Sequence, residues 1–168
     1  MKKLLFALFV LSSFLLTSTR SNAQSNTVNY QMAAGLKFGG YENGISFKYF
    51  PTDKVAFEGI LGFRDHGAVV TGLYEIYQEA FGVHELRFYY GAGGHIGAVG
   101  SGDYQRFNGD NEVYNSGHIL LGIDGVLGLE YIIPKSPIAI SLDLNPRIEL
   151  ATGPFGDIAP GLGLKYTF

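Results

Sequence analysis

The chain has 168 residues, with 12 Lys and Arg against 15 Asp and Glu, 24 Gly, 11 Tyr, 13 Phe, no Cys and no Trp. The absence of Cys excludes disulfides, thiol catalysis and Cys-based metal sites, and an acidic chain without a basic run argues against nucleic acid as a partner. Abundant Gly and aromatic residues with few charges favour β-structure over helices.

The N-terminus has the layout of a secretory signal peptide. Lys2 and Lys3 precede an apolar run over residues 4–16, and Ser21-Asn22-Ala23 supplies small residues before an expected cut at Ala23/Gln24. The run is short for a helix that spans a membrane, and a retained N-terminal anchor is the alternative. The sequence therefore predicts export, with residues 1–23 as the signal peptide.

The expected mature chain, residues 24–168, is one domain by length. Loss of Lys2, Lys3 and Arg20 reduces the basic residues to 12 − 3 = 9, so the net charge becomes 9 − 15 = −6. No segment after Ala23 keeps an apolar 3.6-residue period, and none is apolar for 18 residues, which argues against membrane-spanning helices.

Apolar and polar residues instead alternate with period two in eight runs, as in strands that have one apolar and one polar face. In chain order the apolar faces carry Tyr30, Met32, Ala34, Leu36 and Phe38; Ile45, Phe47 and Tyr49; Val55, Phe57, Gly59, Leu61 and Phe63; Val70, Gly72, Tyr74 and Ile76; Leu86, Phe88, Tyr90, Ala92 and Ile96; Ile119, Leu121, Ile123, Leu127, Leu129 and Tyr131; Ile138, Ile140, Leu142, Leu144, Ile148 and Leu150; and Leu162, Leu164, Tyr166 and Phe168. Eight runs of about ten residues predict an all-β, eight-stranded antiparallel up-and-down transmembrane β-barrel.

The breaks between the runs differ in length. Residues 51–53, 78–82 and 134–137 form short connections at one end, and Val99–Gly117 is the longest irregular stretch, at the other end. Outer-membrane barrels have short periplasmic turns and long external loops, so we expect Val99–Gly117 to be external. Five tyrosines then fall near the periplasmic strand ends and predict an interfacial girdle. They are Tyr30, Tyr49, Tyr74, Tyr131 and Tyr166.

The polar faces carry six cations and six anions. They are Lys37, Lys48, Arg64, Arg87, Arg147 and Lys165, with Glu58, Glu75, Asp124, Glu130, Asp143 and Glu149. A Lys or Arg on the lipid face costs roughly 2–4 kcal/mol at mid-depth, so we expect this set to face the lumen. An eight-stranded lumen is just wide enough for side chains to fill, and balanced charges can pair there. Inward glycines should leave room for them, at Gly35, Gly91, Gly93, Gly97, Gly128 and Gly163. The sequence thus predicts a plugged lumen and no open diffusion pore.

The chain ends on alternating apolar residues, Leu162, Leu164, Tyr166 and Phe168. With the signal peptide and the eight runs, this ending resembles the small eight-stranded bacterial outer-membrane β-barrel family (outer membrane protein A/X type, porin-family β-barrel domain). The resemblance implies a location in the outer membrane and assembly by the barrel insertion machinery, with these four residues as the insertion signal. The chain lacks the C-terminal peptidoglycan-binding domain of outer membrane protein A, so the resemblance supports no wall-tethering role.

Catalytic and metal motifs are weak. His66 or His95 with Ser101 and Asp103 could approach a hydrolase triad, but the chain has neither the Asp-Ser pair of palmitoyltransferase barrels nor the His-x-Ser step of lipid A deacylases. Residues 108–112 resemble a polar turn more than a Ca²⁺ loop. We therefore predict no catalytic residue, metal or cofactor.

The predicted function is that of a non-enzymatic integral outer-membrane barrel, structural or surface-interacting, with outer-membrane lipid as its partner. A lipid-modifying outer-membrane enzyme is one alternative, and a secreted lipocalin-like carrier with inward apolar faces is the other. No motif identifies an external partner.

Overall fold

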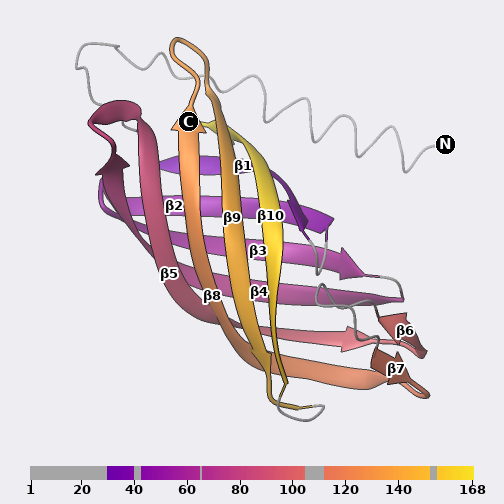
Figure 1. Ribbon diagram of the computed structural model, residues 1–168. Helices are drawn as coiled ribbons and strands as arrows, with labels where there is room; N and C mark the ends of the chain where they lie inside the picture. The colour runs from indigo at the N-terminus through magenta and orange to yellow at the C-terminus, as the bar shows by residue number, and fades with distance from the viewer. Residues whose placement is uncertain (1–29, 40–42, 65, 105–111, 152–154) are drawn as a thin grey trace, which may run out of the picture.

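The computed structural model describes residues 30–39, 43–64, 66–104, 112–151 and 155–168 (Figure 1). The predicted signal peptide, residues 1–23, lies outside this part of the chain. The strands are β1 (Met32–Gly39), β2 (Asn43–Thr52), β3 (Val55–Arg64), β4 (Gly67–Ala80), β5 (Val83–Val99), β6 (Gly102–Tyr104), β7 (Glu112–Tyr114), β8 (His118–Ile132), β9 (Ile138–Glu149) and β10 (Phe155–Thr167). Within the described residues, no helix is long and apolar enough to cross a membrane.

Eight of these strands form a closed barrel in the order β1-β10-β9-β8-β5-β4-β3-β2, in which every neighbouring pair is antiparallel. The last strand pairs with the first, so no edge is left open, which removes the aggregation hazard of an exposed edge. The predicted eight-stranded antiparallel barrel is confirmed. The short hairpin β6–β7 lies between β5 and β8 in the chain and at the end of the barrel opposite to the C-terminus (Figure 1).

The strands are strongly staggered around the barrel. Successive paired residues can be followed once around it: Tyr131, Ile140, Leu164, Leu36, Ile45, Leu61, Val70, Ile96 and Leu121. The circuit leaves β8 at Tyr131 and returns at Leu121, a displacement of 131 − 121 = 10 residues. A shear of ten over eight strands tilts them by roughly 40° to the barrel axis.

The alternation seen in the sequence sorts residues between two faces. The outward apolar side chains are largely exposed, for example Phe47, Leu142 and Leu164 at 47%, 62% and 48%. The inward positions between them are buried, and among the described residues they include as many polar or charged residues as hydrophobic ones, 16 of each. The barrel therefore has an apolar outside and encloses its charged residues, the inverse of a water-soluble domain.

The β4–β5 connection is shorter than the predicted break at residues 78–82. β4 continues to Ala80, which pairs with Val83, and only Phe81 and Gly82 lie between them. Both have positive φ, 56° and 70°, and two left-handed residues match the twist of the flanking strands in a two-residue hairpin. The expected connection gave way to strand because Gln78 and Glu79 pair with Phe88 and Arg87 of β5.

Two further expectations need correction. Val99–Gly117 is not wholly irregular, because β6 and β7 pair with each other within it. The eighth run, which begins at Leu162 in the apolar alternation, is also too short, since β10 already begins at Phe155 and pairs with β9 from there. In both segments hydrogen bonding between strands overrides a local sequence rich in Gly and polar residues.

The predicted tyrosine girdle is wrong for Tyr30. β1 begins at Met32, after a bend at Gln31, so the alternation does not extend back to Tyr30, whose side chain is buried inside the barrel. The other four tyrosines, Tyr49, Tyr74, Tyr131 and Tyr166, are 42–48% exposed on the outer face.

Candidate functional site: the charged interior of the barrel

The structure buries ten of the twelve charged residues that the sequence predicted for the lumen: Lys37, Lys48, Glu58, Glu75, Asp124, Glu130, Asp143, Arg147, Glu149 and Lys165. The other two, Arg64 and Arg87, are half-buried. Seven of the eight barrel strands contribute buried members of this set. The exception is β5, whose member Arg87 is half-buried. The site is therefore assembled by closure of the barrel and not by any local segment.

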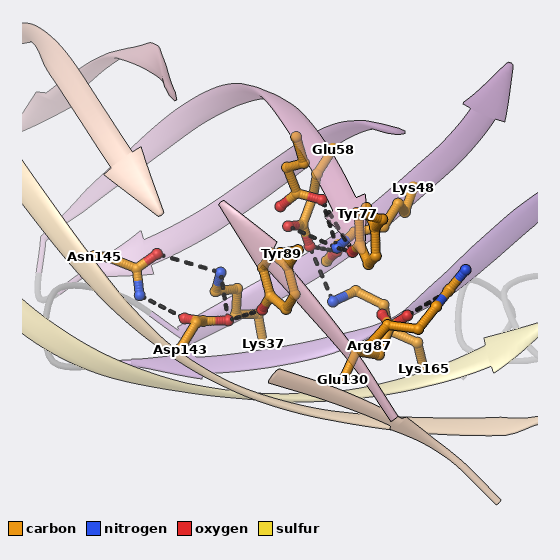
Figure 2. A network of polar contacts seen from close by, with 12 residues as sticks. Lys37, Lys48, Glu58, Tyr77, Arg87, Tyr89, Glu130, Asp143, Asn145 and Lys165 are labelled. Carbon is orange, nitrogen blue, oxygen red and sulfur yellow. Dashed lines mark hydrogen bonds and ion pairs between the residues drawn. The ribbon is translucent and has the colours of Figure 1, made fainter. Parts of the chain in front are cut away.

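Lys48 lies at the centre of one group of charges. Its Nζ is 2.7 Å from Glu75 Oε2 and 3.4 Å from Glu58 Oε2, and it donates a hydrogen bond of 2.5 Å to the hydroxyl of Tyr77. The opposite oxygen of Glu58 lies 3.0 Å from Lys165 Nζ and accepts a hydrogen bond from Ser46. Figure 2 shows Lys48, Glu58 and Lys165 gathered from three strands. Two lysines and two glutamates thus neutralise one another inside the barrel.

Arg87 joins a second group on the same side. Its guanidinium nitrogen Nη2 lies 2.5 Å from Glu130 Oε1. The same oxygen also accepts a hydrogen bond of 2.5 Å from the hydroxyl of Tyr30. The guanidinium carbon is 4.8 Å from the ring centres of Tyr30 and Tyr77 and 5.0 Å from that of Phe50. Desolvated cation–π contacts of this kind are stabilising, and they explain how aromatic rings share the lumen with charges.

Asp143 is the centre of a third group (Figure 2). It lies 3.3 Å from Lys37 Nζ and accepts hydrogen bonds from the hydroxyl of Tyr89 at 2.6 Å and from the amide of Asn145 at 2.5 Å. The Tyr89 ring stacks on Tyr77 at 5.1 Å and so joins this group to Lys48. We call these three groups together the terminus-side network, because they lie nearer the end of the barrel that holds Met32 and Phe168.

A separate loop-side network, defined by His95, Asp124, Arg147 and Glu149, lies nearer β6–β7. His95 Nδ1 is 2.8 Å from Asp124 Oδ2, and His95 Nε2 is 2.9 Å from Glu149 Oε2. Arg147 Nε is 2.5 Å from Asp124 Oδ1, and Arg147 also donates to Thr71 at 3.4 Å. Both ring nitrogens of His95 are engaged by carboxylates, which leaves neither of them to activate Ser101 as the triad hypothesis required.

Apolar side chains separate the two networks and cover one of them. Along β4, Leu73 lies between Thr71 and Glu75, and along β8, Val126 lies between Asp124 and Glu130; both are buried, as is Ile60 on β3. Beyond the loop-side network, Val69, Val99 and Leu120 form a cluster of their own. The interior is thus layered, with charges enclosed between hydrophobic contacts.

Inward glycines make room for the large side chains of the networks. A methyl group at Gly128 would lie 2.6 Å from the Tyr89 ring and 2.7 Å from Asp143 Cβ, whereas one at Gly72, on the outer face, would meet nothing within 4 Å. We expect Gly128→Ala to destabilise the barrel by about 1–3 kcal/mol through overpacking, and Gly72→Ala to change it by less than about 0.5 kcal/mol. Urea unfolding in detergent micelles measures both; equal stabilities would show that Gly128 is not a spacer.

Some interior residues were missed or misplaced at the sequence level, among them Tyr77, Asp157 and Tyr30. Tyr77 lies one two-residue step beyond Glu75, and Asp157 lies four such steps before Lys165, on the same inward faces. Extending the predicted strands along these alternations would have found both residues. Tyr30 had no such signal, because it lies before the bend at Gln31 and the start of β1. Among the described residues, no group of three or more His, Cys, Asp and Glu side chains could hold a metal ion. Residues 108–111 of the discounted Ca²⁺ loop lie outside them.

No protein-family model and no curated protein sequence matches the chain. The crystal structure of the N-terminal β-barrel domain of Pseudomonas aeruginosa OprF is similar, with a TM-score of 0.57 and 20% sequence identity over 82% of this chain and 95% of that domain. Agreement over almost all of that domain at such low identity shows a shared architecture. The chain therefore has the same eight-stranded barrel fold as that OprF domain.

Proposed function

We propose that this protein is a non-enzymatic integral protein of the bacterial outer membrane whose lumen is closed by ion-paired side chains. The observation that carries the proposal is the inverted distribution of polarity. Apolar residues are exposed on every strand of the barrel wall and so form a belt around it. On a typical soluble monomer the exposed apolar residues are instead confined to patches, the largest of roughly 300–600 Å². A belt of this kind around a closed barrel suits hydrocarbon as the surrounding medium.

The interior supports a plug. Lys48, Glu75 and Glu130 have 0% exposure, and the terminus-side network pairs four cations with four anions: Lys37, Lys48, Arg87 and Lys165 with Glu58, Glu75, Glu130 and Asp143. Ions crossing the barrel would have to break these pairs and then pass the layer of Ile60, Leu73 and Val126. A structural or surface-interacting role, through residues 99–117, fits this interior better than diffusion does.

The two alternatives fit less well. A lipocalin-like carrier needs apolar faces turned inward around a ligand, and in this barrel they face outward. A lipid-modifying enzyme needs a histidine free to accept a proton from a nucleophile, and His95 is bound on both sides by carboxylates. His66, which is exposed, is the histidine left for that alternative.

Fractionation and conductance together test the proposal. We expect the full chain to remain in outer-membrane fractions after an alkaline wash, to migrate differently on gels before and after heating, and to give no stable conductance steps in planar bilayers. A protein found dissolved in the periplasm or medium would refute membrane integration, and steady single-channel steps would refute the plug. An altered lipid A profile that disappears in His66→Ala would support the enzyme instead.

Phe168 provides a test of assembly through the last strand. Its backbone N–H and C=O pair with Met32 at 2.9 and 3.0 Å, and its ring is 52% exposed. Deleting Phe168 should reduce the folded, heat-modifiable form in cell membranes several-fold while the purified chain still folds in detergent, because recognition by the insertion machinery is lost and most of the β1–β10 pairing is kept. Phe168→Tyr serves as the control, and unimpaired assembly of the deletion variant in cells would contradict the proposed insertion signal.

A further inference from the structure

The hydrogen-bond geometry of His95 demands two donors from one ring. Its side chain has 0% exposure, and its two ring nitrogens lie 2.8 and 2.9 Å from carboxylate oxygens on two different strands, β8 and β9. A neutral imidazole carries only one N–H, whereas the protonated imidazolium carries two. Only the imidazolium donates to Asp124 and Glu149 at the same time.

The two carboxylates are arranged as acceptors. Asp124 receives Arg147 Nε on its other oxygen at 2.5 Å, and Glu149 receives the backbone N–H of Leu121 on its other oxygen at 2.8 Å. If the shared proton lay on Glu149, a group of intrinsically lower proton affinity than imidazole would hold it. The proton therefore belongs on His95.

The charges around His95 also favour the proton. Asp124 on β8 and Glu149 on β9 contact the ring, and Arg147 on β9 pairs with Asp124. Asp157 on β10 is paired in register with Arg147, β3 contributes the half-buried Arg64, and Thr71 on β4 contributes a neutral hydroxyl. A proton on His95 gives both carboxylates that touch the ring a cationic partner there, and uncompensated buried charge is strongly destabilising.

Neighbouring residues leave room for the His95 ring and cover it. A methyl group at Gly122 would lie 2.5 Å from His95 Cε1, so the glycine leaves the imidazole its place between the strands. Val69, Val99 and Leu120 cover the layer on the side of β6–β7, which restricts the access of water to the ring.

We propose that His95 is held as an imidazolium and that its proton locks the loop-side network, so that loss of the proton in alkaline solution loosens this half of the lumen. The effect on permeation rests on the proposed plug, but the protonation state does not. A neutral ring keeps at most one of the two carboxylate contacts, and the other strand loses its link to β5.

Nitrogen NMR of the full chain, labelled with ¹⁵N-histidine and folded in detergent micelles, tests the protonation state. Histidines of the same chain unfolded in urea are neutral at pH 8, since an ordinary histidine titrates near pH 6.5. We expect both His95 nitrogens to carry protons at pH 8 in the folded protein, assigned by the loss of their signals in His95→Gln. A single-proton tautomer of His95 at pH 8 would overturn the proposal.

Hydrogen exchange tests the lock. The protection factor of the Leu121 amide, which donates to Glu149, should fall at least tenfold over the alkaline range in which NMR shows His95 losing its proton. In His95→Gln the Leu121 amide should already have the low protection factor at pH 7, with no further fall at higher pH. His84→Gln, at the exposed start of β5, is the control and should behave like the unmodified chain. If His95→Gln does not fold, the pH series of the unmodified chain decides, and unchanged protection while the ring deprotonates refutes the lock. Conductance at neutral pH, while NMR shows an intact imidazolium, would refute the proposed plug but not the protonation of His95.

Discussion

Replacing Lys48 by Met should destabilise the folded barrel by about 3–5 kcal/mol, the cost of removing one partner from a buried ion pair. The side chain is fully buried, and its ammonium lies between Glu58 and Glu75 with the hydroxyl of Tyr77 as a third ligand. Methionine keeps a similar length but no charge, so the buried Glu75 loses the ammonium 2.7 Å from its carboxylate. Urea unfolding in micelles, followed by tyrosine fluorescence and heat-modifiable migration, measures the loss.

Two matched variants separate this effect from a general loss of positive charge. Lys54→Met, in the exposed β2–β3 turn, should change stability by less than about 0.5 kcal/mol. The double variant Lys48→Met with Glu75→Gln should recover a large part of the lost stability, because the carboxylate stranded by the first change is then neutral. If Lys48→Met costs no more than Lys54→Met, the terminus-side network contributes nothing measurable to the fold.

Placing a charge on the outer wall should have the second largest effect. Leu142→Arg should destabilise the barrel in lipid bilayers by about 2–4 kcal/mol, the cost of a guanidinium at the middle of the hydrocarbon. Leu142 is 62% exposed and lies in the interior of β9, beside Leu129 on β8 and Leu162 on β10, which also point outward. Equilibrium unfolding from vesicles gives the free energy of unfolding directly.

Phe81→Arg is the control for this change. Phe81 is even more exposed, at 87%, but it lies in the two-residue turn between β4 and β5, outside the strands. We expect its substitution to change stability by less than about 0.5 kcal/mol, because arginine remains hydrated there. Two exposed apolar residues with equal tolerance for arginine would indicate that water surrounds both of them, and the proposal of a membrane barrel would then be wrong.

Much of the barrel could be predicted because period-two alternation is a local property. A strand turns successive side chains to opposite faces, so Lys48 between Phe47 and Tyr49 shows its face without knowledge of its neighbours. The prediction of faces failed where the strand ended, as at Tyr30 beyond the bend at Gln31. The limits of strands were also too short, as at Tyr77 and Asp157, because pairing with an adjacent strand extends β-structure past weak local signals.

The pairing of the charges could not be predicted. Lys48 on β2 contacts Glu58 on β3 across a hairpin, and a contact between adjacent strands of this kind can be predicted from the sequence. The contact of Lys48 with Glu75 on β4 and that of Glu58 with Lys165 on β10 depend on the closed barrel. The same holds for His95 on β5, which acquires its two carboxylates from β8 and β9.

The sequence by itself determined the number of barrel strands, the face of most side chains and the sign of the charges inside, since each follows from spacing along the chain. Only the tertiary structure decided the stagger of ten residues around the barrel and therefore which cation lies at the height of which anion. Alternation repeats every two residues, so a shift of any strand by two preserves every face while it changes every partner. Closure of the barrel fixes one register among these, the one in which the buried charges meet and the inward rings pack together.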